Sequence, residues 1–349
     1  MTLIRPTAEA ADASGAARRQ ATRRAVAVLA LVAVAALIPL LGPSAALTDT
    51  GEAAAPATGG IALLRTVLFA ALCVPAGELF AARLARRVPG APRVAAPRSW
   101  AAYAAAAGFV VALGLASVVA TGNLLPRRLS DMDVGGLYQT RDGRLALLEV
   151  NAFAVAWLCA RSRRPAAQVW PLAAVVLAEA LRAHPATEHG TPVGSALTLV
   201  HVTCAALWAG GLLHVLRLLA GWRATPDITK GPGAEGSSPA GAALLGLYAR
   251  VAAVLFAAIT ATGVWSALRR MPPGTVVDQL TSTAYGRALL AKVLLVAAVA
   301  VLALWARLRL RRAGDPVAAR SPARAEVVAL GMVVAVSGLL TALPLPIRW

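Results

Sequence analysis

The chain has 349 residues, of which 58% are hydrophobic and 14% are charged, and its mean hydropathy is +0.68. Soluble domains are about half apolar and a quarter charged, so this composition excludes an ordinary soluble protein. The net charge of +18 comes from 34 Lys and Arg residues against 16 Asp and Glu residues. These charges lie in short loops between apolar runs and form no aromatic-rich basic patch, which argues against nucleic acid as a partner.

The apolar runs predict an all-α, polytopic transmembrane bundle embedded in the lipid bilayer. Crossing the hydrocarbon core of about 30 Å takes roughly 20 apolar residues in a helix. In chain order, we expect about nine spans at residues 25–41, 61–82, 100–121, 144–160, 167–183, 193–219, 242–268, 284–306 and 325–343.

The first span has an alternative interpretation. Arginines followed by an apolar stretch and "GPSAAL" resemble a signal peptide with its cleavage site, and cleavage would leave eight spans. The apolar run is long for a signal peptide, so we favour a retained helix.

The positions of the basic residues predict the orientation. They concentrate in alternate segments, at 5–24, 83–98, 161–164, 217–230 and 307–324. Cytoplasmic loops are enriched in Lys and Arg, so these segments are expected on the inner side. The expected topology is therefore N-in and C-out.

The same pattern divides the chain into regions. Residues 1–24 form a cytoplasmic tail, residues 25–164 hold four spans, and residues 165–349 hold five. Within the last region, residues 223–241 include the stretch "GPGAEGSSPA", whose composition is typical of a flexible linker. The longer outer loop at 122–143 has room for a short surface helix.

Ionisable residues inside spans are costly and are therefore candidates for a role in transport. Glu149, Glu179 and Lys292 lie in three different spans at similar depth on the predicted outer side. Glu179 and Arg182 also have the spacing of an ion pair within one helix. Lys292 is a candidate to neutralise Glu149 across the bundle. Arg65 lies near a span end, where its side chain can reach the interface.

The histidines predict a metal site at the outer ends of the fifth and sixth spans. His184 and His189 lie in the outer loop, and His201 and Cys204 lie in the outer half of the next span. His201, Cys204 and Trp208 share one helix face at i, i+3 and i+7 spacing. Imidazole and thiolate together suit copper or zinc, and thiolate favours Cu(I). The alternative is structural: His201 would bond across the bundle and Cys204 would fill space.

His214 lies in the same span as His201, on another face and near the cytoplasmic end. It fits an interfacial histidine or an exit-side ligand. His214 is thirteen residues after His201, so the two side chains lie on different faces of the helix. A pair of stacked haems, which needs both histidines on one face, is therefore disfavoured. A single haem held by His201 and a loop histidine stays open. The sequence has no G-x-x-x-x-G-K-[ST] motif and no recognisable soluble catalytic domain, so it predicts neither an ATP-driven pump nor an enzyme.

Three segments together resemble the CopD copper-resistance family. "LTLVHVTCAALWAGGLLHVL" resembles the tryptophan-containing helix of that family, and "LRAHPATEHG" resembles the histidine segment that often precedes it. The stretches around Thr262-Gly263 and Tyr285-Gly286-Arg287 resemble the core of the family. Leu290 and Lys292 continue that match, and the resemblance extends over residues 172–343.

The resemblance implies a multi-pass protein of the inner, or cytoplasmic, membrane that handles copper ions, as Cu(I) or Cu(II). It places His201 and His184 at the histidine positions of the family. CopD-like proteins often work with CopC-like external copper-binding proteins, and here such a carrier would be a separate chain. Two alternatives remain: a b-type haem electron carrier, and a membrane scaffold or assembly protein without a transported substrate.

Overall fold

A computed structural model describes residues 8–53, 55–91, 97–122, 124, 128, 133–184, 191–224, 239–271, 273–313 and 320–344. Throughout these residues the secondary structure is helical, with no strand, which confirms the predicted all-α class. In chain order the helices are α1 (Ala8–Leu47), α2 (Thr58–Ala85), α3 (Ala101–Thr121), α4 (Val134–Gln139), α5 (Arg141–Arg161), α6 (Val169–Arg182), α7 (Thr191–Ala224), α8 (Pro239–Arg270), α9 (Val276–Ser282), α10 (Ala284–Ala313) and α11 (Arg320–Leu340).

Seven helices of the described chain are long and apolar enough to cross a membrane: α1, α2, α3, α5, α7, α8 and α10. The expected count of about nine spans is therefore not confirmed. The predicted fifth span is shorter than expected because residues 165–168 form a 3-10 turn, which leaves 14 residues for α6. At 1.5 Å per residue, α6 is roughly 20 Å long. The apolar part of α11 is also short, at Val327–Leu340.

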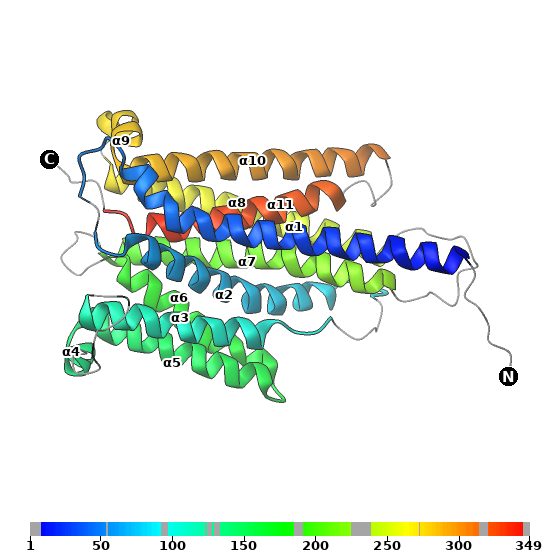
Figure 1. Cartoon of the computed structure of the whole chain (residues 1–349), viewed down its shortest axis with the longest axis horizontal. Coiled ribbons are helices and arrows are strands. Elements are labelled where there is room, and N and C mark those ends of the chain that lie inside the picture. The colour runs from blue at the N-terminus through cyan, green and yellow to red at the C-terminus, as the bar shows by residue number, and fades with distance from the viewer. Residues whose placement is uncertain are drawn as a thin grey trace.

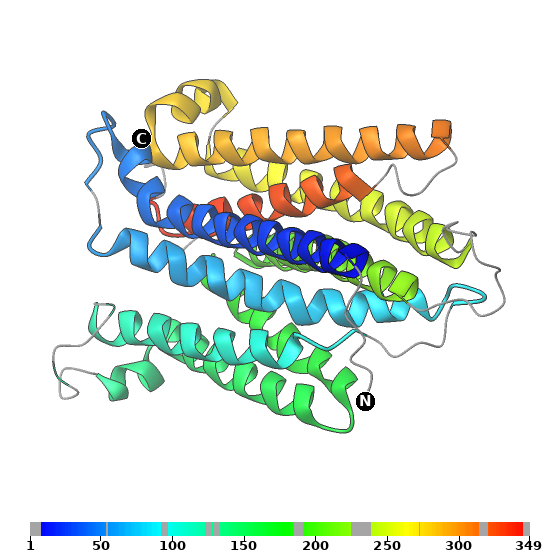
Figure 2. The same ribbon diagram turned by 45° about the vertical axis from the view of Figure 1, so that its right-hand side comes forward.

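The long helices nevertheless run side by side with α6 and α11 in one bundle (Figures 1 and 2). Helix α2 packs against α1, α3, α7 and α11, and α7 packs against α2, α6 and α8. Helices α3, α5 and α6 thus lie on one side of α2, while α8, α10 and α11 lie on the other (Figure 1). Helix α2 therefore joins the N-terminal helices to the C-terminal ones.

The faces turned away from the bundle are apolar. On α10, for example, the side chains of Val293, Leu294 and Val301 are 55%, 62% and 65% exposed. In water such a surface would be unfavourable, whereas in a bilayer it contacts lipid tails. The chain is accordingly a multi-pass membrane protein.

Connections between helices alternate between the two ends of the bundle (Figure 1). The short helices α4 and α9 lie at one end, together with the end of α6 that leads to His184. We call this the His184 end. The loop predicted to have room for a surface helix does contain one, α4. The side of the membrane that each end faces stays a prediction.

The N-terminal and linker segments differ in part from expectation. Helix α1 begins at Ala8, so most of the predicted tail is helical. Helix α7 continues to Ala224 and α8 begins at Pro239, which removes the edges of the predicted linker. The central linker residues lie outside the described part of the chain.

Candidate functional site

His201 lies on α7 and faces α8. Its Nδ1 is 3.0 Å from Oγ1 of Thr262, and the same hydroxyl donates to the backbone carbonyl of Ala258 at 2.7 Å. A hydroxyl has one hydrogen, and here the α8 backbone takes it. The Thr262 oxygen can then accept from His201, which favours the tautomer with the ring hydrogen on Nδ1 and the lone pair on Nε2.

Two further residues of the C-terminal region lie close to this ring. Gly263 presents bare backbone to it, and a Cβ at that position would be 3.5 Å from Cε1 of His201. The ammonium group of Lys292 on α10 interacts electrostatically with the imidazole. The charge of Lys292 on α10 therefore acts on the His201 ring, which itself bonds to Thr262 of α8.

The Tyr285-Gly286-Arg287 segment fixes the connection between α9 and α10. Arg270 donates to the hydroxyl of Tyr285 at 3.0 Å. A Cβ at Gly286 would overlap the Gln279 carbonyl oxygen, so the close turn requires glycine. Arg287 donates to the carbonyl oxygens of Thr281 and Thr48. This segment therefore positions the start of α10, the helix that carries Lys292.

His184 is buried between the end of α6 and the start of α7. Its Nε2 is 3.1 Å from Oγ1 of Thr198, and a Cβ at Gly194 would overlap its Nδ1. The guanidinium of Arg141 donates to the carbonyl oxygens of His184 and Leu181, which holds the end of α6 in place. His189, the other predicted loop ligand, lies outside the described residues.

Cys204 is partly buried and packs against the apolar cluster that contains Trp208. The Trp208 ring makes an edge contact with Phe256, with ring centroids 5.4 Å apart, and its carbonyl oxygen accepts from Tyr248 at 2.7 Å. Over the described ranges, no three His, Cys, Asp or Glu side chains lie together in a group that could hold a metal ion. The proposed set of four ligands thus stays a prediction.

His214 lies at the opposite end of α7. Its Nδ1 is 3.0 Å from Nη1 of Arg217, and its ring is in edge contact with Trp100. Arg217 also stacks on the Trp100 ring at 3.6 Å and donates to the carbonyl oxygen of Arg98. A guanidinium only donates hydrogen bonds, so the Nδ1 lone pair is occupied. This arrangement favours a structural interfacial histidine over an exit-side ligand.

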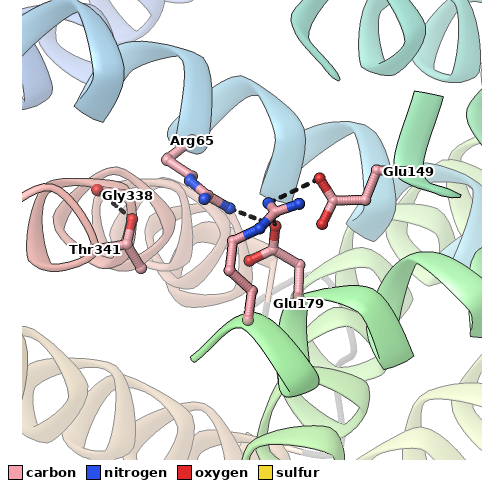
Figure 3. A network of polar contacts seen from close by, with 6 residues as sticks. Arg65, Glu149, Glu179, Gly338 and Thr341 are labelled. Atoms are coloured by element: carbon pink, nitrogen blue, oxygen red, sulfur yellow. Dashed lines mark hydrogen bonds and ion pairs between the residues drawn. The ribbon is translucent and has the colours of Figure 1, made fainter. Parts of the chain in front are cut away.

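Glu149 and Glu179 belong to one buried ion-pair network (Figure 3). Nη1 of Arg182 lies 2.9 Å from Oε2 of Glu149 and 3.3 Å from Oε1 of Glu179. Arg65 of α2 binds the same oxygen of Glu179. The predicted ion pair within α6 is confirmed. The counter-ion of Glu149 is Arg182, whereas Lys292 lies near His201.

Sequence reasoning missed the role of Arg65, which was expected to point toward the interface. Its side chain is 14% exposed and pairs across helices with Glu179. The signal that could have found it was its depth in the membrane. Arg65 and Glu149 lie at about the same distance from the predicted outer ends of their spans. Charge depth alone could therefore have indicated one shared layer.

The comparisons with known proteins bear on the C-terminal half of the bundle. Residues 242–342, which comprise nearly all of α8 and the whole of α9, α10 and α11, match the family model described as Copper resistance protein D. Neither the curated proteins nor the solved structures gave a match. The match includes Thr262, which bonds to His201, Gly263, which lies against its ring, and Lys292, whose charge acts on it. Over residues 242–342, therefore, the sequence of this membrane protein matches the model of the CopD copper-resistance family.

Proposed function

We propose that the protein moves copper ions across the cytoplasmic membrane, or maintains their balance there, through a histidine site near the His184 end. Copper is the substrate in this proposal, and the protein has no catalytic role. The copper-resistance family match and the transmembrane helical bundle support the general assignment.

The observation that carries the proposal is the state of His201. Histidines that bind metals commonly donate their second ring N–H to an oxygen acceptor, which fixes the tautomer and orients the ring. Thr262 supplies that acceptor from within the family-matched region. The neutral imidazole then offers its Nε2 lone pair, which is the form that coordinates copper.

The remaining predicted ligands belong to the same proposal. Cys204 lies one turn from His201 on α7 and would supply a soft thiolate, which favours Cu(I). His184 would exchange its Thr198 contact for the metal, and His189 would collect ions above it. The positive charge of Lys292 disfavours a cation near His201, so we propose that it limits the residence of copper there and promotes release.

The predicted orientation places the His184 end outside, where a separate CopC-like copper-binding protein could deliver the ion. The arginine-rich segments then face the cytoplasm. A carrier of this kind would meet α4, α9 and the α6–α7 turn, which all lie at that end (Figure 1).

Cellular copper content tests the proposal. Cells that express the wild type, the His184→Ala/His201→Ala double variant or an empty vector are compared by mass spectrometry at equal membrane levels of protein. We expect the wild type alone to change the copper content, and the sign of the change gives the direction of movement. Gly246→Ala on α8 is the matched control, because its new methyl group meets no atom within 4 Å.

Equal copper in all three samples would contradict transport and favour a scaffold or assembly role. A haem absorbance band in the purified wild type that is lost in His201→Ala would instead favour the b-type electron carrier. Neither outcome alters the family match of residues 242–342.

A further inference from the structure

The ion-pair network of Arg65, Glu149, Glu179 and Arg182 is unevenly bonded. Glu179 accepts from two guanidinium groups, whereas Glu149 accepts from Arg182 alone and through one oxygen. Yet Glu149 is the more deeply buried carboxyl, with a side chain 1% exposed against 8% for Glu179. Its second oxygen, Oε1, is buried without a hydrogen-bond partner. Glu149 is therefore the carboxylate whose charge is least compensated.

The other charged groups near Glu149 belong to the same network. Helix α6 contributes Arg182 and Glu179, and α2 contributes Arg65. The helices α3 and α4 carry no charged residue, and the only titratable side chains on them are those of Tyr103 and Tyr138. On α5 itself, the other charged residues lie in its first turn and at its last residue, away from Glu149.

A buried carboxylate with an unpaired oxygen is stabilised by taking up a proton. The proton would come from water at the His184 end and form an O–H bond at Oε1. Figure 3 shows the carboxyl groups of Glu149 and Glu179 on facing helices, and they lie within hydrogen-bonding reach of each other. A protonated Glu149 can thus donate to Glu179, and its ionic attraction to Arg182 is lost.

Arg182 is the last residue of α6 and immediately precedes the turn that holds His184. Loss of the Glu149 attraction would leave Arg182 bonded to Glu179 within its own helix. Arg141 of α5, which donates to the carbonyl oxygens of His184 and Leu181, would still bind the turn, but the ionic link through Arg182 would be lost. The charge state of Glu149 is therefore linked to the position of the histidine at the proposed copper entrance.

We propose that Glu149 is a reversible proton-binding site, with Arg182 as its switching partner, and that proton binding there is coupled to copper movement. The coupling rests on the proposed function, whereas proton binding itself does not. Proton uptake and release at Oε1 would let a transmembrane pH gradient drive or oppose passage of the ion.

Infrared difference spectroscopy on the purified full-length chain, without copper, tests the proton site directly. As the pH is lowered, we expect a carbonyl stretching band of a buried protonated carboxyl to appear in the wild type. This band should be missing in Glu149→Gln and present in Asp142→Asn, which changes an exposed acid of the same helix. A wild type without a titrating buried band, or a band that persists in Glu149→Gln, would overturn the proposal.

Copper uptake into proteoliposomes then tests the coupling. We expect an imposed pH gradient to change the wild-type rate several-fold and to leave the Glu149→Gln rate unchanged, while Asp142→Asn behaves as the wild type. A wild-type uptake rate that is the same with and without the pH gradient would refute the coupling. A titrating band in a protein that takes up no copper would instead refute the proposed function and leave the proton site standing.

Discussion

Three histidines in the described part of the chain differ in what their ring nitrogens can do. His201 donates from Nδ1 to Thr262 and keeps its Nε2 lone pair. His214 accepts from Arg217 through Nδ1, so its remaining nitrogen carries the hydrogen. His184 has Nε2 against the Thr198 hydroxyl and Nδ1 against Gly194. The bonding partners therefore separate His214, whose Nδ1 lone pair is occupied, from His201 and His184, which stay candidate ligands.

Thr262→Val should weaken copper binding without a large loss of packing. Valine has nearly the shape of threonine but cannot accept the Nδ1–H, so the ring loses its fixed tautomer. We expect about a 10–100-fold lower copper affinity, as for other lost outer-shell partners. Competition with a chromophoric Cu(I) chelator measures the affinity. Thr262→Ser keeps the hydroxyl and should retain wild-type affinity; equal loss in both variants would contradict the tautomer argument.

Arg182→Met should destabilise the bundle. The change leaves Glu149 without its ionic partner and Glu179 with Arg65 alone. Removing one member of a buried ion pair typically costs about 3–5 kcal/mol. Reversible unfolding in mixed detergent measures the free energy of unfolding. Arg144→Met, at an exposed position of α5, is the control, and adding Glu149→Gln to Arg182→Met should recover part of the loss.

At the scale of elements, the crossing of α2 and α7 depends on two glycines. A Cβ at Gly210 would overlap the carbonyl oxygen of Cys73, and one at Gly77 would overlap the backbone of Gly210. Helix backbones in membranes approach this closely only where the side chains are small. Because α7 carries the histidines and α2 carries Arg65, this crossing sets the spacing between the two polar groups.

Gly210→Ala should therefore be destabilising although alanine is the better helix former. The added methyl group meets backbone, which cannot move aside as a flexible side chain would, so we expect a loss of about 1–3 kcal/mol or more. Gly246→Ala on α8 meets no atom within 4 Å. That control should be neutral or stabilising by about 0.5–1 kcal/mol. Similar unfolding curves for both variants would contradict the close crossing.

The sequence was sufficient to predict the seven long membrane-spanning helices of the described chain, but not the rotation of each helix about its axis. Apolar length located the long helices, and charge depth identified Glu149 and Glu179 as a polar layer. The partners of these side chains could not be predicted, because pairing across a bundle depends on the rotation of each helix about its axis. Arg65 and Arg182 face Glu179 for that reason, whereas the charge of Lys292 acts on His201. The short length of α6 was missed because the apolar pattern continues through its 3-10 turn.

At the scale of the whole molecule, α6 decides the topology. It is short for a bilayer span, yet α5 ends and α7 begins at opposite ends of the bundle (Figure 1). The chain can join those ends only if α6 traverses the bundle. Local thinning of the bilayer can accommodate a helix of this length at modest cost. The buried ion-pair network would favour such thinning, because a thinner bilayer brings water closer to its charges.

Reporter fusions on the two sides of α6 should therefore report opposite compartments. With the arginine-rich segments inside, we expect a fusion after residue 164 to be active with a cytoplasmic reporter and a fusion after residue 184 with an external one. A fusion after residue 224 should again report the cytoplasm, and one after residue 344 the outside. Fusions at 164 and 184 that both report the cytoplasm would mean that α6 does not cross. His201 would then lie nearer the cytoplasm, and copper would meet the histidine site from within the cell.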